Sequence, residues 1–105
     1  MVDDIDAVGM TATRYLEGRS PDHHVIGLGR HVVGSNVFWY MKDPCGNMFE
    51  CYSDMDDIQD DDAWEIGTDW APTAFARWGP NQPPEVFFAP ADLEEIAKAR
   101  EAEGR

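Results

Sequence analysis

The stretch Asp43-Pro44-Cys45-Gly46 limits the fold of this 105-residue chain more than any other sequence feature. Aspartate at the first position, proline at the second and glycine at the fourth suit a type I turn that closes with a left-handed glycine bulge. The turn lies between two β-prone runs, residues 37–42 and 48–53. The sequence therefore predicts a tight hairpin in which Asp43 lies opposite Asn47.

Counting outward from this turn predicts which strand residues lie opposite one another. The expected pairs are Lys42 with Met48, Tyr40 with Glu50, and Phe38 with Tyr52. These side chains share one face, and the other face is apolar and should pack on a helix. A glutamate and a tyrosine then project side by side from the face opposite the helix. Such a carboxylate needs a cation, a metal or a hydrogen-bond network beside it.

An amphipathic helix is predicted over residues 5–16, where apolar side chains recur at helical spacing. Asp3 or Asp4 can cap its start. Gly9 lies inside this helix, and close packing on a sheet would be one reason to tolerate a glycine there. A third strand is predicted over residues 24–30, so the expected order is a helix followed by a three-stranded antiparallel meander.

After residue 53 the composition of the chain changes, first to an acidic run and then to an aromatic-rich segment. Six aspartates lie between Asp54 and Asp62, and we interpret this run as a solvated loop. A calcium loop is the alternative, but the glycine and terminal glutamate of an EF-hand are missing at the required spacing. The aromatic residues that follow predict an irregular arm laid over apolar surface: Trp64, Trp70, Phe75, Trp78, Phe87 and Phe88. A short helix is predicted over residues 91–103.

Composition narrows the class of protein. The 21 acidic and 8 basic residues give a formal charge of −13, which disfavours nucleic acid and anionic membranes as partners. No apolar run approaches the roughly 20 residues that cross a bilayer. We therefore expect one soluble, cytoplasmic domain with a modest core. Cys45 and Cys51 are expected to be free thiols.

Two stretches resemble a known family. GRHVVGSNVFWY at residues 29–40 and DPCGNMFECYSD at residues 43–54 closely resemble the C-terminal part of type I extradiol dioxygenases. These enzymes belong to the vicinal oxygen chelate superfamily, and the resemblance is specific over residues 2–58. It implies an α+β fold, a βαβββ module that lacks most of its first strand. Residues 1–58 would form this partial module, and residues 59–105 an irregular arm and short helix of the same domain.

The resemblance also implies roles for three residues. Glu50 matches the carboxylate ligand of the metal, Tyr40 the tyrosine that hydrogen-bonds a substrate oxygen, and His31 an active-site histidine that contacts the substrate or bound oxygen. The alternatives are an ion-paired strand glutamate, an amphipathic core tyrosine and a turn histidine. His23 and His24 match no ligand position and are expected to start a strand.

The family holds Fe(II), or in some members Mn(II), with two histidines and a glutamate. Both histidines lie on first strands of modules, and Met1–Asp4 looks like the tail of such a strand, so neither ligand is expected in this chain. The resemblance thus implies the C-terminal part of an enzyme that cleaves a catechol-type ring with Fe(II) and O2, inactive by itself.

Two other hypotheses stay open. The chain could be a non-catalytic binding or assembly module, because loss of the first strand would expose a sheet edge to a second copy or a complementing chain. It could also be a differently metallated or cofactor-independent superfamily member, such as a lyase or a resistance protein.

Overall fold

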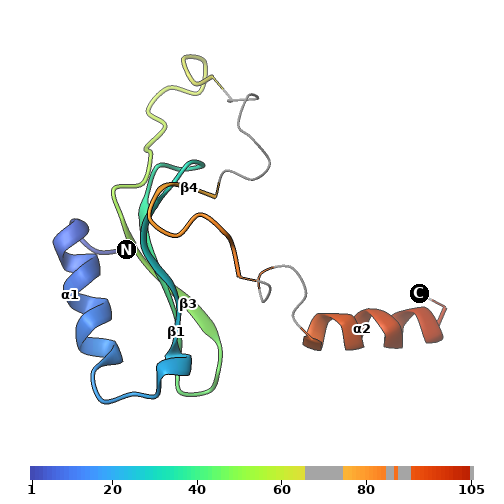
Figure 1. Ribbon diagram of the computed structural model, residues 1–105. Coiled ribbons are helices and arrows are strands. Elements are labelled where there is room, and N and C mark those ends of the chain that lie inside the picture. The colour runs from blue at the N-terminus through green and yellow to red at the C-terminus, as the bar shows by residue number, and fades with distance from the viewer. Residues whose placement is uncertain (66–74, 85–86, 88–90, 105) are drawn as a thin grey trace.

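The computed structural model describes residues 1–65, 75–84, 87 and 91–104. The elements are helix α1 (Ile5–Leu16), a 3-10 helix η1 (Pro21–His23), strands β1 (His24–His31), β2 (Val37–Lys42), β3 (Met48–Ser53) and β4 (Ala76–Trp78), and helix α2 (Ala91–Ala102). The strands form one antiparallel sheet in the order β3-β2-β1-β4. Helix α1 runs along one face of the sheet, and α2 stands apart from it (Figure 1).

The hairpin between β2 and β3 has the predicted register. Tyr40 lies opposite Glu50, and the pairs on either side of them agree as well. At the turn, the backbone N–H of Asp43 donates to Asn47 O at 2.7 Å, and that of Gly46 donates to Asp43 O at 3.0 Å. Gly46 has a φ of 86°, the left-handed conformation that the turn requires of its glycine. The turn therefore sets the alignment of the two strands.

Helix α1 is capped and packed as its sequence predicts. The Asp4 side chain accepts from Ala7 N at 2.7 Å, so Asp4 is the residue that caps the helix. The buried face of α1 meets the apolar face of the sheet in one cluster: Val8, Ala12, Val37, Met41 and Cys51. The Tyr15 hydroxyl fastens the end of the helix to β2 by donating to Lys42 O at 2.7 Å. The opposite face of this sheet carries Tyr40 and Glu50 and is called the site face.

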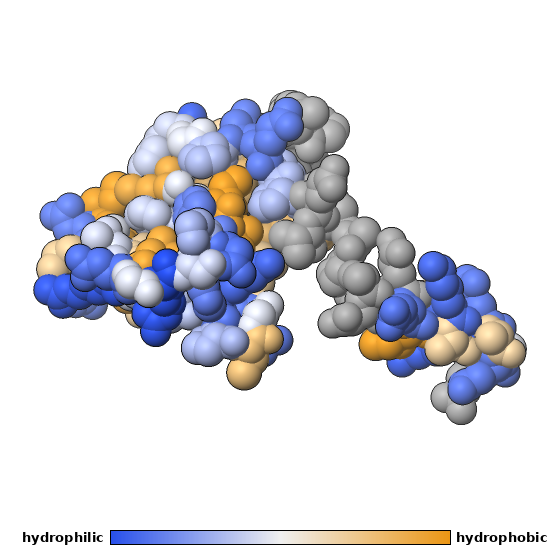
Figure 2. Space-filling model, turned by 60° about the horizontal axis from the view of Figure 1, so that its bottom comes forward, coloured by the Kyte–Doolittle hydropathy of each residue, from blue (hydrophilic) through white to orange (hydrophobic). Residues whose placement is uncertain are grey.

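Gly9 does not pack on the sheet, so that expectation was wrong. A Cβ atom at this position would meet nothing within 4 Å, because Val8 and Ala12 are the buried residues of the helix. Gly9 instead lines an open hollow of ≈ 820 Å³ together with Met10 and other residues of α1 and with Leu28 of β1. Figure 2 shows apolar patches exposed among hydrophilic residues on the face of the molecule that it presents.

The arm is not wholly irregular, which corrects the sequence-based expectation. Residues Ala76–Trp78 form β4, with His31 opposite Ala76 and Arg30 opposite Trp78. Three residues are too few for the alternating pattern that identifies a strand in a sequence. A Cβ atom on Gly79 would lie 2.4 Å from Leu28 O, so glycine permits this close approach to β1.

The aromatic residues of the arm divide into two groups. Phe75 and Phe87 cover the apolar cluster of Ile26, Phe38 and Ala76 on the site face, as predicted. Trp64 and Trp78 are 44% and 42% exposed and cover little. Trp70 and Phe88 lie outside the described residues.

The two edges of the sheet differ. Strand β4 covers the outer edge of β1, whereas the outer edge of β3 receives a backbone hydrogen bond from Val2 N to Tyr52 O, at 2.8 Å. This contact places Val2 beside β3, although residues 1–4 do not form a strand. The α+β arrangement agrees with a partial vicinal oxygen chelate module. Neither of the described α-helices is long and apolar enough to cross a membrane.

Candidate functional site

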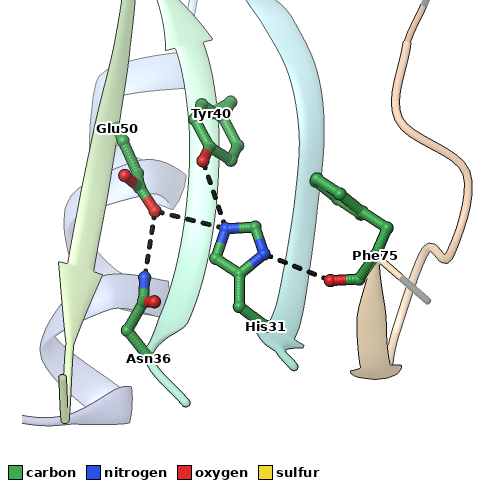
Figure 3. A network of polar contacts seen from close by, with 5 residues as sticks. All are labelled: His31, Asn36, Tyr40, Glu50 and Phe75. Carbon is green, nitrogen blue, oxygen red and sulfur yellow. Dashed lines mark hydrogen bonds and ion pairs between the residues drawn. The ribbon is translucent and has the colours of Figure 1, made fainter. Parts of the chain in front are cut away.

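His31, Tyr40 and Glu50 meet on the sheet face opposite α1 (Figure 3). His31 ends β1, Tyr40 lies in β2 and Glu50 in β3, so three neighbouring strands supply one residue each. The His31 Nε2 atom lies 3.1 Å from the Tyr40 hydroxyl oxygen and 3.6 Å from Glu50 Oε1. The side chains of His31 and Glu50 are 14% and 24% exposed. The structure therefore brings all three predicted site residues together.

Asn36 belongs to the same cluster, although no role was predicted for it from the sequence. Its Nδ2 donates to Glu50 Oε1 at 3.1 Å, and its backbone carbonyl accepts from His31 N at 2.9 Å. Asn36 is only 2% exposed. An asparagine buried next to a turn is a weak sequence signal, because asparagine is common in turns for local reasons.

Arg30 holds the loop that carries Asn36. Its Nη1 donates to Asp54 Oδ2 at 2.8 Å and also to the Ser35 carbonyl. Ser35 and Asp54 both have positive φ values, 58° and 59°, which non-glycine residues adopt only where surrounding contacts hold them. Arg30 thus fixes the loop that orients the Glu50 carboxylate.

The arm closes the cluster on the side of His31. The Phe75 carbonyl oxygen lies 3.3 Å from His31 Nδ1 (Figure 3), and the Phe75 ring meets the imidazole edge to face at 4.9 Å. The imidazole also stacks on Phe38, with ring centroids 4.1 Å apart. Phe87 packs against Tyr40 at 4.9 Å. Aromatic side chains therefore surround the polar atoms and reduce their contact with water.

The surroundings of Tyr40 keep its hydroxyl protonated. Burial is the largest cause, and the negative charge and hydrogen bond of Glu50 add to it; together they raise the pKa of Tyr40 to about 12. Tyr40 is therefore a neutral hydrogen-bond donor near pH 7.

His23 and His24 make contacts between the start of β1 and β2. His23 Nδ1 lies 3.0 Å from Lys42 O, and His24 Nδ1 accepts from Trp39 Nε1 at 3.0 Å. His24 is the first residue of β1, as expected, whereas His23 ends the 3-10 helix η1 just before the strand, so the expectation was wrong for His23.

The metal donors of the described residues do not by themselves fit ferrous iron. Among these residues, no group of three or more His, Cys, Asp or Glu side chains could hold a metal ion. Glu50 has one imidazole beside it, that of His31, whereas the resemblance implies two histidines and a glutamate.

A comparison with known proteins finds a relative. The chain is 37% identical over 82 residues to Metapyrocatechase 2 of Cupriavidus necator. The match covers 78% of this chain and 25% of the relative, so the chain spans about a quarter of the length of the protein it matches. No family model matches the chain, and no solved structure matches it significantly.

Proposed function

This chain is a homologue of an extradiol catechol dioxygenase over most of its length, and from that relationship we propose that it forms the C-terminal part of an enzyme that opens a catechol-type ring with Fe(II) and O2. The observation that carries the proposal is the meeting of His31, Tyr40 and Glu50 on one face. The resemblance to extradiol dioxygenases implies functional roles for these three positions, and they are far enough apart in the sequence to meet only through the fold.

In this proposal Glu50 supplies one of three protein ligands to the metal. Its carboxylate is partly exposed, and Asn36 holds one oxygen in a fixed direction. The two histidine ligands would come from outside the described residues. A single carboxylate binds ferrous iron weakly, so we expect the described residues alone to be inactive.

Tyr40 and His31 would act on the substrate. Because Tyr40 stays protonated, its hydroxyl can donate to an oxygen of the substrate but cannot serve as a base near pH 7. His31 Nε2 lies within hydrogen-bond distance of that hydroxyl and could exchange a proton with a catechol hydroxyl placed beside it.

The aromatic surroundings support an aromatic substrate. Phe38, Phe75 and Phe87 line the polar cluster, and an apolar wall beside a few polar groups suits a planar ring that carries adjacent hydroxyls.

The experiment replaces the matched segment of Metapyrocatechase 2 with the corresponding part of this chain. We expect the chimera to bind iron and open a catechol ring, because the relative would supply the missing ligands. In the same chimera, Glu50→Gln should lower iron affinity at least tenfold and abolish turnover. Iron content and ring opening are measured by metal analysis and by absorbance of the product.

Glu17→Gln is the matched control, since Glu17 caps the end of α1. It should leave iron affinity and turnover unchanged. A folded chimera in which Glu50→Gln binds iron as well as its parent would overturn the role of Glu50.

The open edge of β3 favours a second candidate, an assembly module. Among the described residues, one backbone hydrogen bond from Val2 reaches this edge. An edge with unpaired N–H and C=O groups can pair with a strand of another chain.

A further inference from the structure

We infer that the arm segment Phe75–Gly79 determines the tautomer of His31. The Phe75 carbonyl fixes the proton of the neutral imidazole on Nδ1 and leaves Nε2 as the acceptor that faces Tyr40. The inference deepens the proposed function and rests on its placement of His31 in the site. It makes the arm a positioning element for His31 instead of a simple cover.

The contact between His31 and Phe75 determines which nitrogen carries the proton. The Phe75 carbonyl oxygen lies 3.3 Å from Nδ1, and a carbonyl can only accept a hydrogen bond. A neutral imidazole has one N–H, so that N–H must be on Nδ1 for the contact to be favourable. The lone pair of Nε2 then faces the Tyr40 hydroxyl at 3.1 Å, so that this hydroxyl can donate either to Nε2 or to Glu50.

The opposite tautomer makes poorer contacts with the same neighbours. It would place the lone pair of Nδ1 against the Phe75 carbonyl, so that two acceptors would face each other. Its N–H on Nε2 could still donate to the Tyr40 hydroxyl oxygen at 3.1 Å, although not to Glu50 Oε1 at 3.6 Å, so the Phe75 carbonyl is the contact that distinguishes the two tautomers. Glu50 Oε1 already accepts from Asn36 Nδ2 at 3.1 Å.

Backbone pairing holds the Phe75 carbonyl in place. Ala76, the next residue, lies opposite His31 in the β1–β4 pairing, and its N–H donates to Asn81 Oδ1 at 2.7 Å. Gly79 ends the segment with a φ of 87°, where a Cβ atom would lie 2.4 Å from Leu28 O and 2.6 Å from Gly29 Cα. Docking of the arm on β1 therefore depends on Gly79 having no side chain.

The tautomer determines which nitrogen of His31 can accept a proton. A histidine that is to take a proton from a hydroxyl needs an unprotonated nitrogen aimed at that hydroxyl. With the arm docked, Nε2 is that nitrogen. With the arm displaced, nothing else among the described contacts of Nδ1 favours the proton there, and a free imidazole prefers it on Nε2.

The test reads the tautomer directly by NMR of the full chain labelled with 15N-histidine, under conditions in which the ring is neutral. His31→Gln identifies the His31 signals. We expect the Nδ1 signal of His31 to show the attached proton and the Nε2 signal to show the unprotonated form. A proton found on Nε2 in the unaltered chain overturns the inference.

Gly79→Ala should then displace β4 and move the His31 proton largely or partly to Nε2. Gly18→Ala is the matched control, because Gly18 also has a positive φ, 70°, but open space around it and lies outside the β2–β3 hairpin, and it should leave the tautomer unchanged. If Gly79→Ala unfolds the chain, Asn81→Ala loosens the same segment more gently. A detached β4 with the proton still on Nδ1 contradicts the inference.

No metal or substrate enters this measurement. A failed chimera experiment would therefore overturn the proposed reaction and leave the tautomer result standing, and a proton on Nε2 would do the reverse.

Discussion

The pKa of Tyr40 reports the charge of the neighbouring Glu50. Two of the three causes that raise the pKa of Tyr40 to about 12 come from Glu50, and burial is the largest cause. Glu50→Gln should therefore lower the pKa of Tyr40 while leaving it above the ordinary value of 10.0. NMR titration of 13C-labelled tyrosine measures this, with Glu17→Gln as the control. An unchanged pKa would show that Glu50 and Tyr40 do not interact in solution.

The same residue predicts how stability depends on alkaline pH. The pKa of Tyr40 is about 12 in the folded chain and near 10.0 when unfolded, so the unfolded state loses this proton first. The stabilising contribution is complete below pH 10 and is lost as the pH rises toward 12. Tyr40→Phe should therefore lose less stability than the unaltered chain between pH 8 and pH 11. Urea unfolding at both pH values measures this, and equal losses would contradict it.

Asn36 should contribute more to stability than an exposed asparagine with a similar contact. Asn36→Ala leaves the Glu50 carboxylate without its donor in a partly buried site, which costs about 1–3 kcal/mol of unfolding free energy. Asn47 donates from its Nδ2 to Asp43 Oδ2 at 3.3 Å but is exposed, so Asn47→Ala should cost less. Chemical denaturation compares the two variants, and equal losses would show that burial at Asn36 adds nothing.

At the scale of elements, the packing of α1 on the sheet should dominate stability. Met41 lies fully buried in the cluster beneath α1, so Met41→Ala should cost about 2–5 kcal/mol by leaving a cavity. Met10 lies on the outer side of the helix and is 53% exposed. Met10→Ala is the matched control and should change stability by less than about 0.5 kcal/mol. Thermal unfolding of both variants tests this difference.

The elements that could be predicted from sequence are those with a local signal. The turn at Asp43 determined the β2–β3 register and so placed Tyr40 beside Glu50, and helical spacing identified α1. Strand β4 has only three residues and pairs with β1 from far along the chain, so no local pattern indicates it. The contacts of Asn36 and Phe75 were missed for the same reason, since each depends on how a loop or the arm approaches His31.

At the scale of the whole molecule, two features oppose each other. The outer edge of β3 carries backbone groups that can pair: Val2 N bonds Tyr52 O, and because strand peptide groups alternate, those of Glu50 and Met48 point outward as well. The net charge of −13 repels a second copy. Association through this edge should therefore depend on ionic strength.

We predict that copies of the chain associate more strongly at high salt, because the screening length falls from about 30 Å at 0.01 M to about 3 Å at 1 M salt. Light scattering after size-exclusion chromatography should then report a larger mass at 1 M than at 0.01 M sodium chloride. Met48→Pro removes an outward N–H from the first residue of β3 and should reduce this association without breaking the β2–β3 ladder. Met10→Ala is the control and should associate as the unaltered chain does. Alanine replaces Met10 there because proline would disrupt α1. A monomer at every salt concentration, or equal association of the Met48→Pro variant, would show that the β3 edge does not pair.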